Sequence, residues 1–205
     1  MSVEAKSVLQ KTLESYGGLE DIALSFNGGK DCTVLLHLLS TVLPGNSRPI
    51  DCIYVPDADS FVEVEEFITY CIGFYNLNLV RFDGVDIKSA LSTYLRDNPN
   101  KKAILMGTRQ SDPYSKHLET FSQTDASWPQ IMRVNPLLCW KYTDIWAYIR
   151  ECGVPYCCLY DQGFTSLGSK KRTNRTPCLK SEDYSCGYMP AWKLQDGQQE
   201  RAGRG

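Results

Sequence analysis

Ser25-Phe26-Asn27-Gly28-Gly29-Lys30-Asp31 is the stretch of sequence that decides the fold. It follows the apolar run Ile22-Ala23-Leu24, which is typical of a short buried strand. Leucine and valine then recur at helical spacing, so we predict a helix that begins at about Lys30. A strand, a tight glycine turn and a helix direct backbone N–H groups and the positive end of the helix toward an anion. The adjacent Gly28 and Gly29 lack the Cβ atoms that would keep a phosphate at a distance.

The glycine stretch differs from a Walker A loop, which has four residues between its glycines and a Ser or Thr after the lysine. Here Gly28 and Gly29 are adjacent, and Asp31 follows Lys30. This compact form resembles the PP-loop of enzymes that cleave ATP between the α- and β-phosphates. An ordinary glycine turn is the alternative, because such turns are common before helices. The strand before the loop and the long amphipathic helix after it favour phosphate binding.

Length and composition indicate one globular domain without a strong charge. The chain has 205 residues, enough to bury most of its apolar surface, and a net charge of −2. That charge provides no positive field to attract nucleic acid. The nine cysteines include no CxxC pair and only two histidines are present, so we expect reduced thiols and no zinc site. No signal peptide or membrane span is visible, and we expect a cytoplasmic monomer with no membrane or nucleic-acid partner.

Strand and helix patterns alternate along the chain. Apolar runs predict strands at residues 22–24, 50–55, 77–82, 103–106 and 132–138. Helical spacing predicts helices at residues 5–16, 30–43, 61–75, 87–95 and 143–153, the last with Thr143 as its N-cap. Residues 108–133 show no periodicity, which indicates either a functional loop or regular structure that the pattern does not reveal. This alternation predicts a three-layer α/β fold, in which a mostly parallel twisted sheet has right-handed crossovers and helices on both faces.

Polar and turn-forming residues follow the predicted strands. The glycine loop follows the first strand, Pro56-Asp57-Ala58-Asp59-Ser60 follows the second, and Gly107-Thr108-Arg109-Gln110-Ser111-Asp112-Pro113 follows the fourth. Each segment alone is compatible with ordinary turn chemistry. In a parallel sheet, however, these segments converge on the edge where ligands bind. Trp128-Pro129 lies in the long loop and is a candidate stacking surface for a flat ring.

Groups of residues along almost the whole chain match the motifs of one enzyme family. They are Phe26-Asn27-Gly28-Gly29-Lys30-Asp31, Gly107-Thr108-Arg109 with Asp112-Pro113-Tyr114, Trp128-Pro129 with Met132-Arg133-Val134-Asn135-Pro136-Leu137, residues 140–146, Val154-Pro155-Tyr156, residues 159–168 and Glu200-Arg201-Ala202-Gly203-Arg204. Over about residues 22–204 the chain resembles the eukaryotic FAD synthases, most closely the fungal type. Ser111 stands where the family often has Thr, and Thr176 stands where it usually has Asn before Pro177.

The resemblance implies a fold like that of phosphoadenylyl-sulfate reductases and other adenine nucleotide alpha-hydrolase-like proteins. It implies transfer of the adenylyl group of ATP to the phosphate of FMN, with FAD and pyrophosphate as products. It further implies a nucleotide-binding core at about residues 1–107, a flavin-binding loop with the last strand and helices at about 108–180, and a tail at about 181–205. Many family members also carry a separate N-terminal domain, which these 205 residues do not include.

The resemblance also implies roles for individual residues. The glycine loop would hold the β- and γ-phosphates, and Mg²⁺ would be held through the substrate phosphates. The ATP-binding residues would be Ser25, Gly28, Gly29, Lys30, Tyr54, Val55, Gly107 and Arg109. The flavin-binding residues would be Asp112, Trp128, Pro129, Arg133, Asn135 and Pro136. The catalytic residues would be Asn27, Asp31, Asp112, Arg201 and Arg204, which act by positioning and electrostatics because the FMN phosphate is itself the nucleophile.

The C-terminal arginines have two interpretations. Arg201 and Arg204 are three residues apart, so on a helical turn they would share one face, and their guanidinium groups suit phosphate oxygens. Composition alone indicates a solvated, frayed terminus, because the segment from Gln195 to Gly205 is polar and rich in glycine. The family resemblance favours the phosphate-binding interpretation.

Three other functions stay open at this stage. A sulfonucleotide reductase would need a C-terminal Glu-Cys-Gly-x-His setting, whereas Cys186-Gly187 follows Ser185 and no histidine lies beyond His117. A tRNA-modifying PP-loop enzyme would need spaced catalytic cysteines and a basic face. A non-enzymatic flavin or nucleotide carrier would not need both a loop lysine and two tail arginines.

Overall fold

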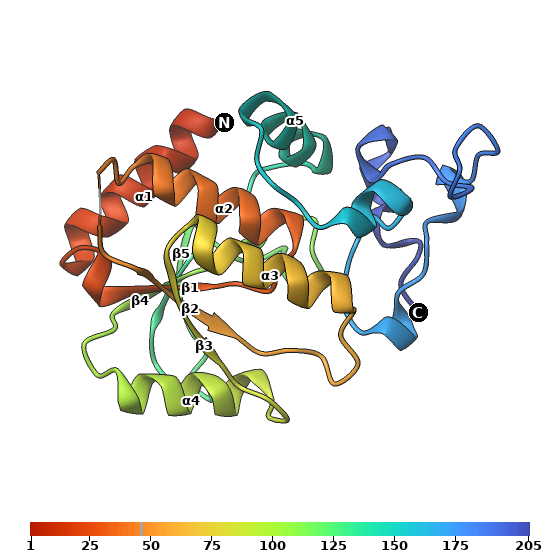
Figure 1. Ribbon diagram of the computed structural model, residues 1–205. Helices are drawn as coiled ribbons and strands as arrows, with labels where there is room; N and C mark the ends of the chain where they lie inside the picture. The colour runs from red at the N-terminus through yellow and green to blue at the C-terminus, as the bar shows by residue number, and fades with distance from the viewer. Residues whose placement is uncertain (46) are drawn as a thin grey trace.

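A twisted, mostly parallel sheet forms the centre of the computed structural model, which describes residues 1–45 and 47–205 (Figure 1). Its strands are β1 (Ile22–Ser25), β2 (Ile50–Tyr54), β3 (Leu77–Arg81), β4 (Ala103–Leu105), β5 (Phe121–Gln123) and β6 (Met132–Val134). They lie in the order β3-β2-β1-β4-β6-β5, and β5 pairs antiparallel with β6 while the other pairs are parallel. The strand order therefore reverses between β1 and β4, which makes this point the expected ligand site.

Helices cover both faces of the sheet, so the predicted three-layer α/β fold is confirmed. The α-helices are α1 (Ser2–Tyr16), α2 (Lys30–Thr41), α3 (Val62–Phe74), α4 (Ile87–Asp97) and α5 (Tyr142–Cys152). Figure 1 shows α1, α2 and α3 above the sheet, with α5 beside α2, and α4 below it. None of the helices within residues 1–45 and 47–205 is long and apolar enough to cross a membrane.

Alternating side chains of the strands divide the core between the two faces. On β1, Ile22 and Leu24 pack into the larger cluster under α1, α2, α3 and α5, whereas Ala23 packs into a smaller cluster against α4. Ile53 and Ile104, on the neighbouring strands, join Ala23 in the smaller cluster. This two-residue alternation is what a strand covered on both faces requires. The buried strands also explain why their sequences read as nearly continuous apolar runs.

The structure answers one open question on secondary structure and shows two predictions to be wrong. The long loop after β4 contains β5, a three-residue strand too short to show an alternating pattern. The strand predicted at residues 132–138 ends at Val134, and the buried residues after it form turns. Thr143 does not cap α5, because the helix already begins at Tyr142 with Lys141 as its N-cap. The backbone N–H of Lys141 donates a hydrogen bond to Oδ2 of Asp144 at 2.7 Å.

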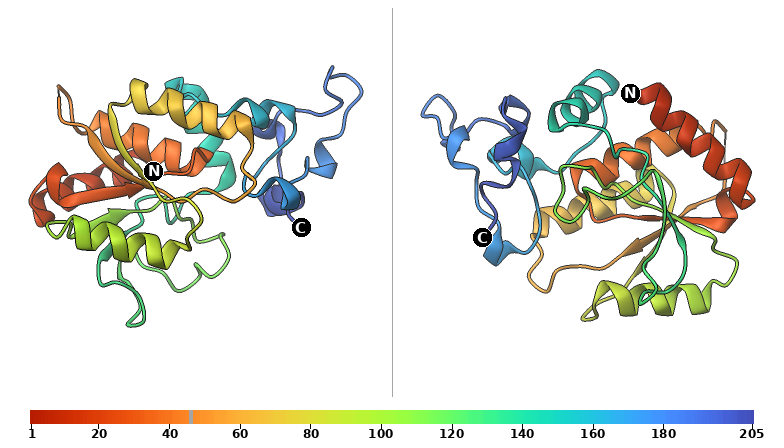
Figure 2. Two further views of the ribbon diagram at one scale, coloured as in Figure 1. Left: turned by 60° about the horizontal axis from the view of Figure 1, so that its bottom comes forward. Right: turned by 180° about the vertical axis from the view of Figure 1, so that it is seen from behind.

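Short 3₁₀ turns build the last third of the chain. They are η2 (Cys158–Gln162), η3 (Lys170–Arg172), η4 (Pro177–Leu179), η5 (Ala191–Lys193) and η6 (Gly197–Arg201), and η1 (Leu19–Asp21) precedes β1. Figure 2 shows this C-terminal part, in blue, beside the end of α3 and away from α1. The N–H of Asn174 donates to the carbonyl of Gly203 at 2.7 Å, and Thr173 and Arg204 form an isolated bridge. The tail is therefore packed on the protein rather than frayed.

Close backbone packing sets the position of α2 against the end of β4. A Cβ added at Gly107 would lie 2.9 Å from the nitrogen of Cys32 and 3.1 Å from the carbonyl carbon of Asp31, both in the first turn of α2. We expect Gly107→Ala to lower the free energy of unfolding by about 1–3 kcal/mol, because backbone atoms must move apart. The matched control is Gly73→Ala in α3, where a Cβ meets nothing within 4 Å. That change should raise stability by up to about 0.5 kcal/mol.

Urea denaturation of the two variants measures both effects. A Gly107→Ala protein as stable as the wild type would contradict the close approach of β4 and α2.

Candidate active site

The loop between β1 and α2 is shaped by its glycines and by Asn27. Gly28 has a φ of +72°, in the left-handed region that favours glycine, and a Cβ there would lie 3.0 Å from Cγ1 of Ile68. Asn27 Oδ1 accepts a hydrogen bond from the N–H of Gly29 at 3.0 Å, and the N–H of Lys30 donates to the hydroxyl of Tyr160 at 3.0 Å. The loop thus presents the first turn of α2 at the carboxyl edge of the sheet, a geometry that suits an anion.

Six charged side chains meet beside this loop, and we call them the charge cluster: Lys30, Asp31, Arg109, Asp112, Glu200 and Arg201. Lys30 Nζ lies 3.0 Å from Oδ2 of Asp31 and also pairs with Oε1 of Glu200. Nη2 of Arg109 donates to Oε1 and Oε2 of Glu200 at 2.7 and 2.6 Å. Nε of Arg109 lies 2.7 Å from Oδ1 of Asp31. Three positive and three negative groups make the cluster neutral as a whole.

The cluster is buried at its centre and opens at Arg201. The side chains of Lys30 and Arg109 are 2% and 1% exposed, whereas that of Arg201 is 44% exposed. Asp112 connects the two regions, because its Oδ2 accepts from the N–H of Arg109 at 2.9 Å and its Oδ1 lies 3.3 Å from Nη2 of Arg201. A ligand entering here meets the partly exposed guanidinium of Arg201 before the buried pairs.

Burial and charge act in opposite directions on Asp31. Burial alone would raise the pKa of this carboxyl, but the positive charges of Lys30 and Arg109, with the hydrogen bond from Lys30, hold its pKa below the ordinary value. Asp31 is therefore ionised at neutral pH. With both oxygens next to cations, it is placed to orient Lys30 and Arg109 rather than to act as a general base.

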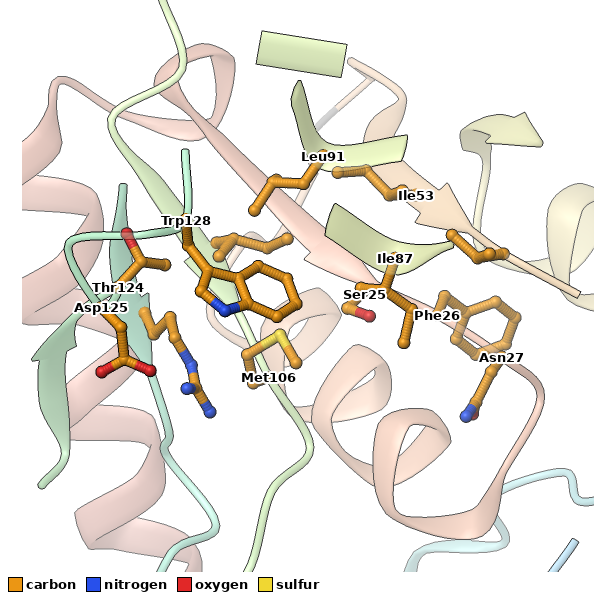
Figure 3. Close-up of a pocket in the computed structure, with 13 residues that line it drawn as sticks. Ser25, Phe26, Asn27, Ile53, Ile87, Leu91, Met106, Thr124, Asp125 and Trp128 are labelled. Atoms are coloured by element: carbon orange, nitrogen blue, oxygen red, sulfur yellow. The ribbon is translucent and has the colours of Figure 1, made fainter. Parts of the chain in front are cut away.

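A cavity of about 350 Å³ opens between β1, β2, β4, α4 and the loop that carries Trp128 (Figure 3). Figure 3 shows the Trp128 ring in the middle of this cavity beside Met106, with Thr124 and Asp125 at one end and Asn27 at the other. Its walls are largely apolar; the lining residues include Ile53, Val55, Ile87, Leu91, Ile104 and Arg133. Such a space suits a flat ring system that carries polar groups at its edge.

Two polar cavities adjoin the apolar one at the glycine loop. The first, of about 210 Å³, is lined by Gly29, Gly107 and members of the charge cluster. The second, of about 280 Å³, is lined by Tyr54, Asp57 and both tail arginines, among others. Asn27 lines all three cavities. The three cavities therefore lie next to one another around Asn27, one apolar and two polar, and we call them together the cleft.

The structure brings most of the predicted site residues to this cleft. Those lining it are Ser25, Asn27, Gly29, Lys30, Asp31, Tyr54, Val55, Gly107, Asp112, Trp128, Arg133, Arg201 and Arg204. Gly28 does not line the cleft; it faces α3, where the side chain of Ile68 leaves no room for a Cβ. Arg109 is a buried member of the charge cluster that lines none of the three cavities, and its carboxylate partners separate it from the cleft.

Three predicted flavin contacts do not line the cleft. Asn135 is fully buried, and its Nδ2 donates to the carbonyl of Glu119 at 2.9 Å. Pro136 is buried in the turn after β6. The carbonyl of Pro129 accepts from the hydroxyl of Thr124 at 2.8 Å. Asn135 and Pro129 thus hydrogen-bond within the protein and Pro136 is buried, so their positions give no support to direct contact with a ligand.

Sequence reasoning missed three residues of the site. Glu200 is buried between Lys30 and Arg109, although it lies in a polar, glycine-rich segment that looks solvated. Asp125 lines the apolar cavity three residues before Trp128. Tyr160 binds the N–H of Lys30 and lines the polar cavity. Glu200 and Tyr160 fall within motifs that match the family, which is the signal that could have identified them; Asp125 had no such signal.

Low pH should weaken the ion pairs of the charge cluster, because it protonates Asp31. Because the folded-state pKa of Asp31 is depressed, its contribution to stability is present above the unfolded pKa of about 3.9 and is lost as pH falls through the folded pKa. Below pH 4, we expect the free energy of unfolding to fall less steeply for Asp31→Asn than for the wild type. The difference should be about 1.4 kcal/mol for each pH unit by which the fold lowers the pKa of Asp31. Urea titrations at pH 3 to 7 measure this, with exposed Asp183→Asn as the matched control. Parallel curves for the wild type and Asp31→Asn would contradict the ion pairs.

Comparisons with known proteins agree with this geometry. A family model described as the phosphoadenosine phosphosulfate reductase domain matches residues 21–90 and 81–175. The chain is 44% identical to a probable FAD synthase of Caenorhabditis elegans over 98% of this chain and 40% of that protein. It is 39% identical to a probable FAD synthase of Schizosaccharomyces pombe, over 90% of this chain and 72% of that protein. The chain thus spans about two fifths of the length of the nematode relatives, at 40% and 39%.

A solved structure extends the likeness to three dimensions. The FMN adenylyltransferase of Candida glabrata superposes with a TM-score of 0.91 at 30% sequence identity, over 99% of this chain and 86% of that chain. Structures of that enzyme hold FMN with the ATP analogue AMPCPP, or FAD with inorganic pyrophosphate. The order of motifs, the sheet and the cleft lead to one family: the chain belongs to the FAD synthases, within the phosphoadenosine phosphosulfate reductase domain family.

Proposed function

We propose that this chain transfers the adenylyl group of ATP to the phosphate of FMN, forming FAD and releasing pyrophosphate. The observation that carries the proposal is the cleft, in which a ring-sized apolar cavity lies next to two polar cavities at the glycine loop. The complexes of the Candida glabrata enzyme support the proposal, because one contains FMN with an analogue of ATP and another contains FAD with pyrophosphate.

The cleft suggests where each part of the substrates binds. The flavin ring would lie in the apolar cavity against Trp128, with Asp125 and Arg133 near its polar edge. The backbone at Tyr54 and Val55 would face the adenine. The phosphates of both substrates would then meet beside the glycine loop, where N–H groups and the tail arginines offer positive charge.

The reaction needs positioning more than acid–base chemistry. An ionised oxygen of the FMN phosphate forms a bond to the α-phosphorus of ATP, while the bond from that phosphorus to its bridging oxygen breaks and its electron pair leaves with pyrophosphate. No proton has to be removed from the nucleophile. The residues must align two polyanions and offset the charge that develops on the leaving oxygen.

The tail arginines are the best-placed groups for offsetting that charge. The charge cluster is neutral, and Lys30 is held between two carboxylates, so Lys30 acts on the phosphates at longer range. Arg201 and Arg204 both line the second polar cavity. Burial, followed by the neighbouring charge of Arg201, lowers the pKa of Arg204. The guanidinium of Arg204 donates to the hydroxyl of Thr173 at 3.3 Å. Two such guanidinium groups suit phosphate oxygens.

The residues present fit a Mg²⁺ ion that arrives with the nucleotide. Within the described part of the chain, no three His, Cys, Asp or Glu side chains are grouped to hold a metal ion. Asp31, Asp112 and Glu200 already bind cations of the charge cluster. Asp57, which lines the second polar cavity, is therefore the carboxylate best placed to assist such an ion. A hard cation held mainly by phosphate oxygens matches this donor set, and when bound it would reduce the repulsion between the two substrates.

The alternative functions lack support in the cleft. Cys186, the residue that a sulfonucleotide reductase would need, does not line any of the three cavities. Cys32 does line the polar cavity, but burial raises the pKa of its thiol to about 12, so it is not a thiolate at neutral pH. Neither cysteine is placed for nucleophilic sulfur chemistry. We further propose, from the sequence, that the protein is a cytoplasmic monomer that acts on small molecules and not on nucleic acid.

Incubation of the protein with ATP, Mg²⁺ and FMN should produce FAD and pyrophosphate in equal amounts, measured by chromatography and by the fall in flavin fluorescence. Riboflavin in place of FMN should give no product, because it lacks the attacking phosphate. A chelator should stop the reaction. Formation of FAD directly from riboflavin, or full activity with the chelator, would contradict the proposal.

Arg201→Ala and Arg204→Ala should each cost about 2–4 kcal/mol of transition-state stabilisation, seen mainly in kcat, because water cannot replace a guanidinium aimed at developing charge. The double variant should lose less than the sum, since both groups act on the same phosphates. Melting temperatures should change little. Arg96→Ala, an exposed arginine of α4, is the matched control and should be neutral. Normal turnover by both tail variants would remove the arginines from the mechanism.

A further inference from the structure

Glu200 is the buried contact between the C-terminal tail and the first βα unit. It lies 170 residues after Lys30 in the chain, and its carboxylate binds both Lys30 and Arg109. The two cations come from different elements, the start of α2 and the segment after β4. One carboxylate thus ties the tail to both sides of the point where the strand order reverses.

The backbone of Glu200 is held as firmly as its side chain. Its carbonyl accepts a hydrogen bond from the hydroxyl of Thr165 at 2.6 Å, and Thr165 is itself buried. Beyond Glu200, the N–H of Arg204 donates to the carbonyl of Arg201 at 2.9 Å, which closes a turn. The turn links both arginines to Glu200. The carboxylate therefore helps to hold the backbone that carries the two guanidinium groups, together with the hydrogen bonds from Asn174 to Gly203 and from Gly205 to Arg172.

We infer that Glu200 is a positioning residue, which binds Lys30 and Arg109 so that Arg201 and Arg204 face the phosphate-binding cavities. The inference rests on the proposed function, because it takes these arginines to bind substrate phosphates. It also gives the loop lysine a second role: the Nζ of Lys30 anchors the tail that carries the arginines. Stability alone does not account for the arrangement, since burying an ion pair seldom stabilises a fold more than well-packed apolar side chains would.

A double-mutant cycle shows whether Glu200 acts through the two tail arginines or independently of them. Glu200→Gln should lower kcat on the order of 30- to 100-fold with little change in KM for FMN, because the arginines lose their alignment with the transition state. In an Arg201→Ala/Arg204→Ala background, the same change should cost less than about threefold, because nothing is left to position. An equal loss in both backgrounds, or no loss in either, would overturn the inference.

Hydrogen exchange provides a readout that does not depend on FAD synthesis. Glu200→Gln should speed exchange of the amides of Ala202 and Arg204 at least tenfold, while Glu182→Gln, the same change at an exposed carboxylate, should leave them unchanged. Unchanged exchange in Glu200→Gln would show that the tail is held by other contacts and would overturn the inference. If the wild type makes no FAD but the Glu200→Gln variant still exchanges faster, the proposed function is refuted, whereas the anchoring of the tail by Glu200 is supported.

Thr165→Val offers a second variant if Glu200→Gln does not fold. It removes the hydroxyl that binds the Glu200 carbonyl and leaves the buried charges untouched. We expect a smaller fall in kcat, about 3- to 10-fold, with the same lack of effect in the double-arginine background. A loss that persists in that background would contradict the inference.

Discussion

The ion pairs of Glu200 with Lys30 and Arg109 are the interaction on which the rest of the site depends. They bring together the first helix after the glycine loop, the segment after β4 and the end of the chain. In a low-dielectric interior a charge without a partner is costly, so each of these groups restricts where the other two can lie. The pairs therefore contribute more to the uniqueness of the arrangement than to its net stability.

The sheet supplies the frame in which those charges can meet. Its strand order reverses between β1 and β4, so the loops after these strands diverge and leave a cleft at their carboxyl ends. On the lower face, α4 covers the sheet with only a small apolar cluster. The ring-sized cavity lies there, bounded by Ile53 and Ile104 from the sheet and by Trp128 from the loop.

Charge balance explains how the free protein tolerates a site built for polyanions. Inside the cleft, Asp31 and Glu200 neutralise Lys30 and Arg109, which allows three buried charges and the half-buried Asp31 to lie together. At the opening, Arg201 pairs with the carboxylate of Asp112 and is partly exposed. Positive charge that is incompletely compensated is thus concentrated at the rim, where an incoming phosphate can reach it without breaking the buried pairs.

The sequence alone determined the features that depend on near neighbours. These are the alternation of strands and helices, the tight glycine loop, and the family motifs that indicated Trp128, Asp112 and the tail arginines as site residues. These signals are local, because side-chain period and backbone preference act over a few residues. Only the tertiary structure decided the pairing of the short β5 and the burial of Glu200 against Lys30. Both depend on contacts between distant segments, where the free energy comes from desolvation and matched charge and leaves no periodic pattern in the sequence.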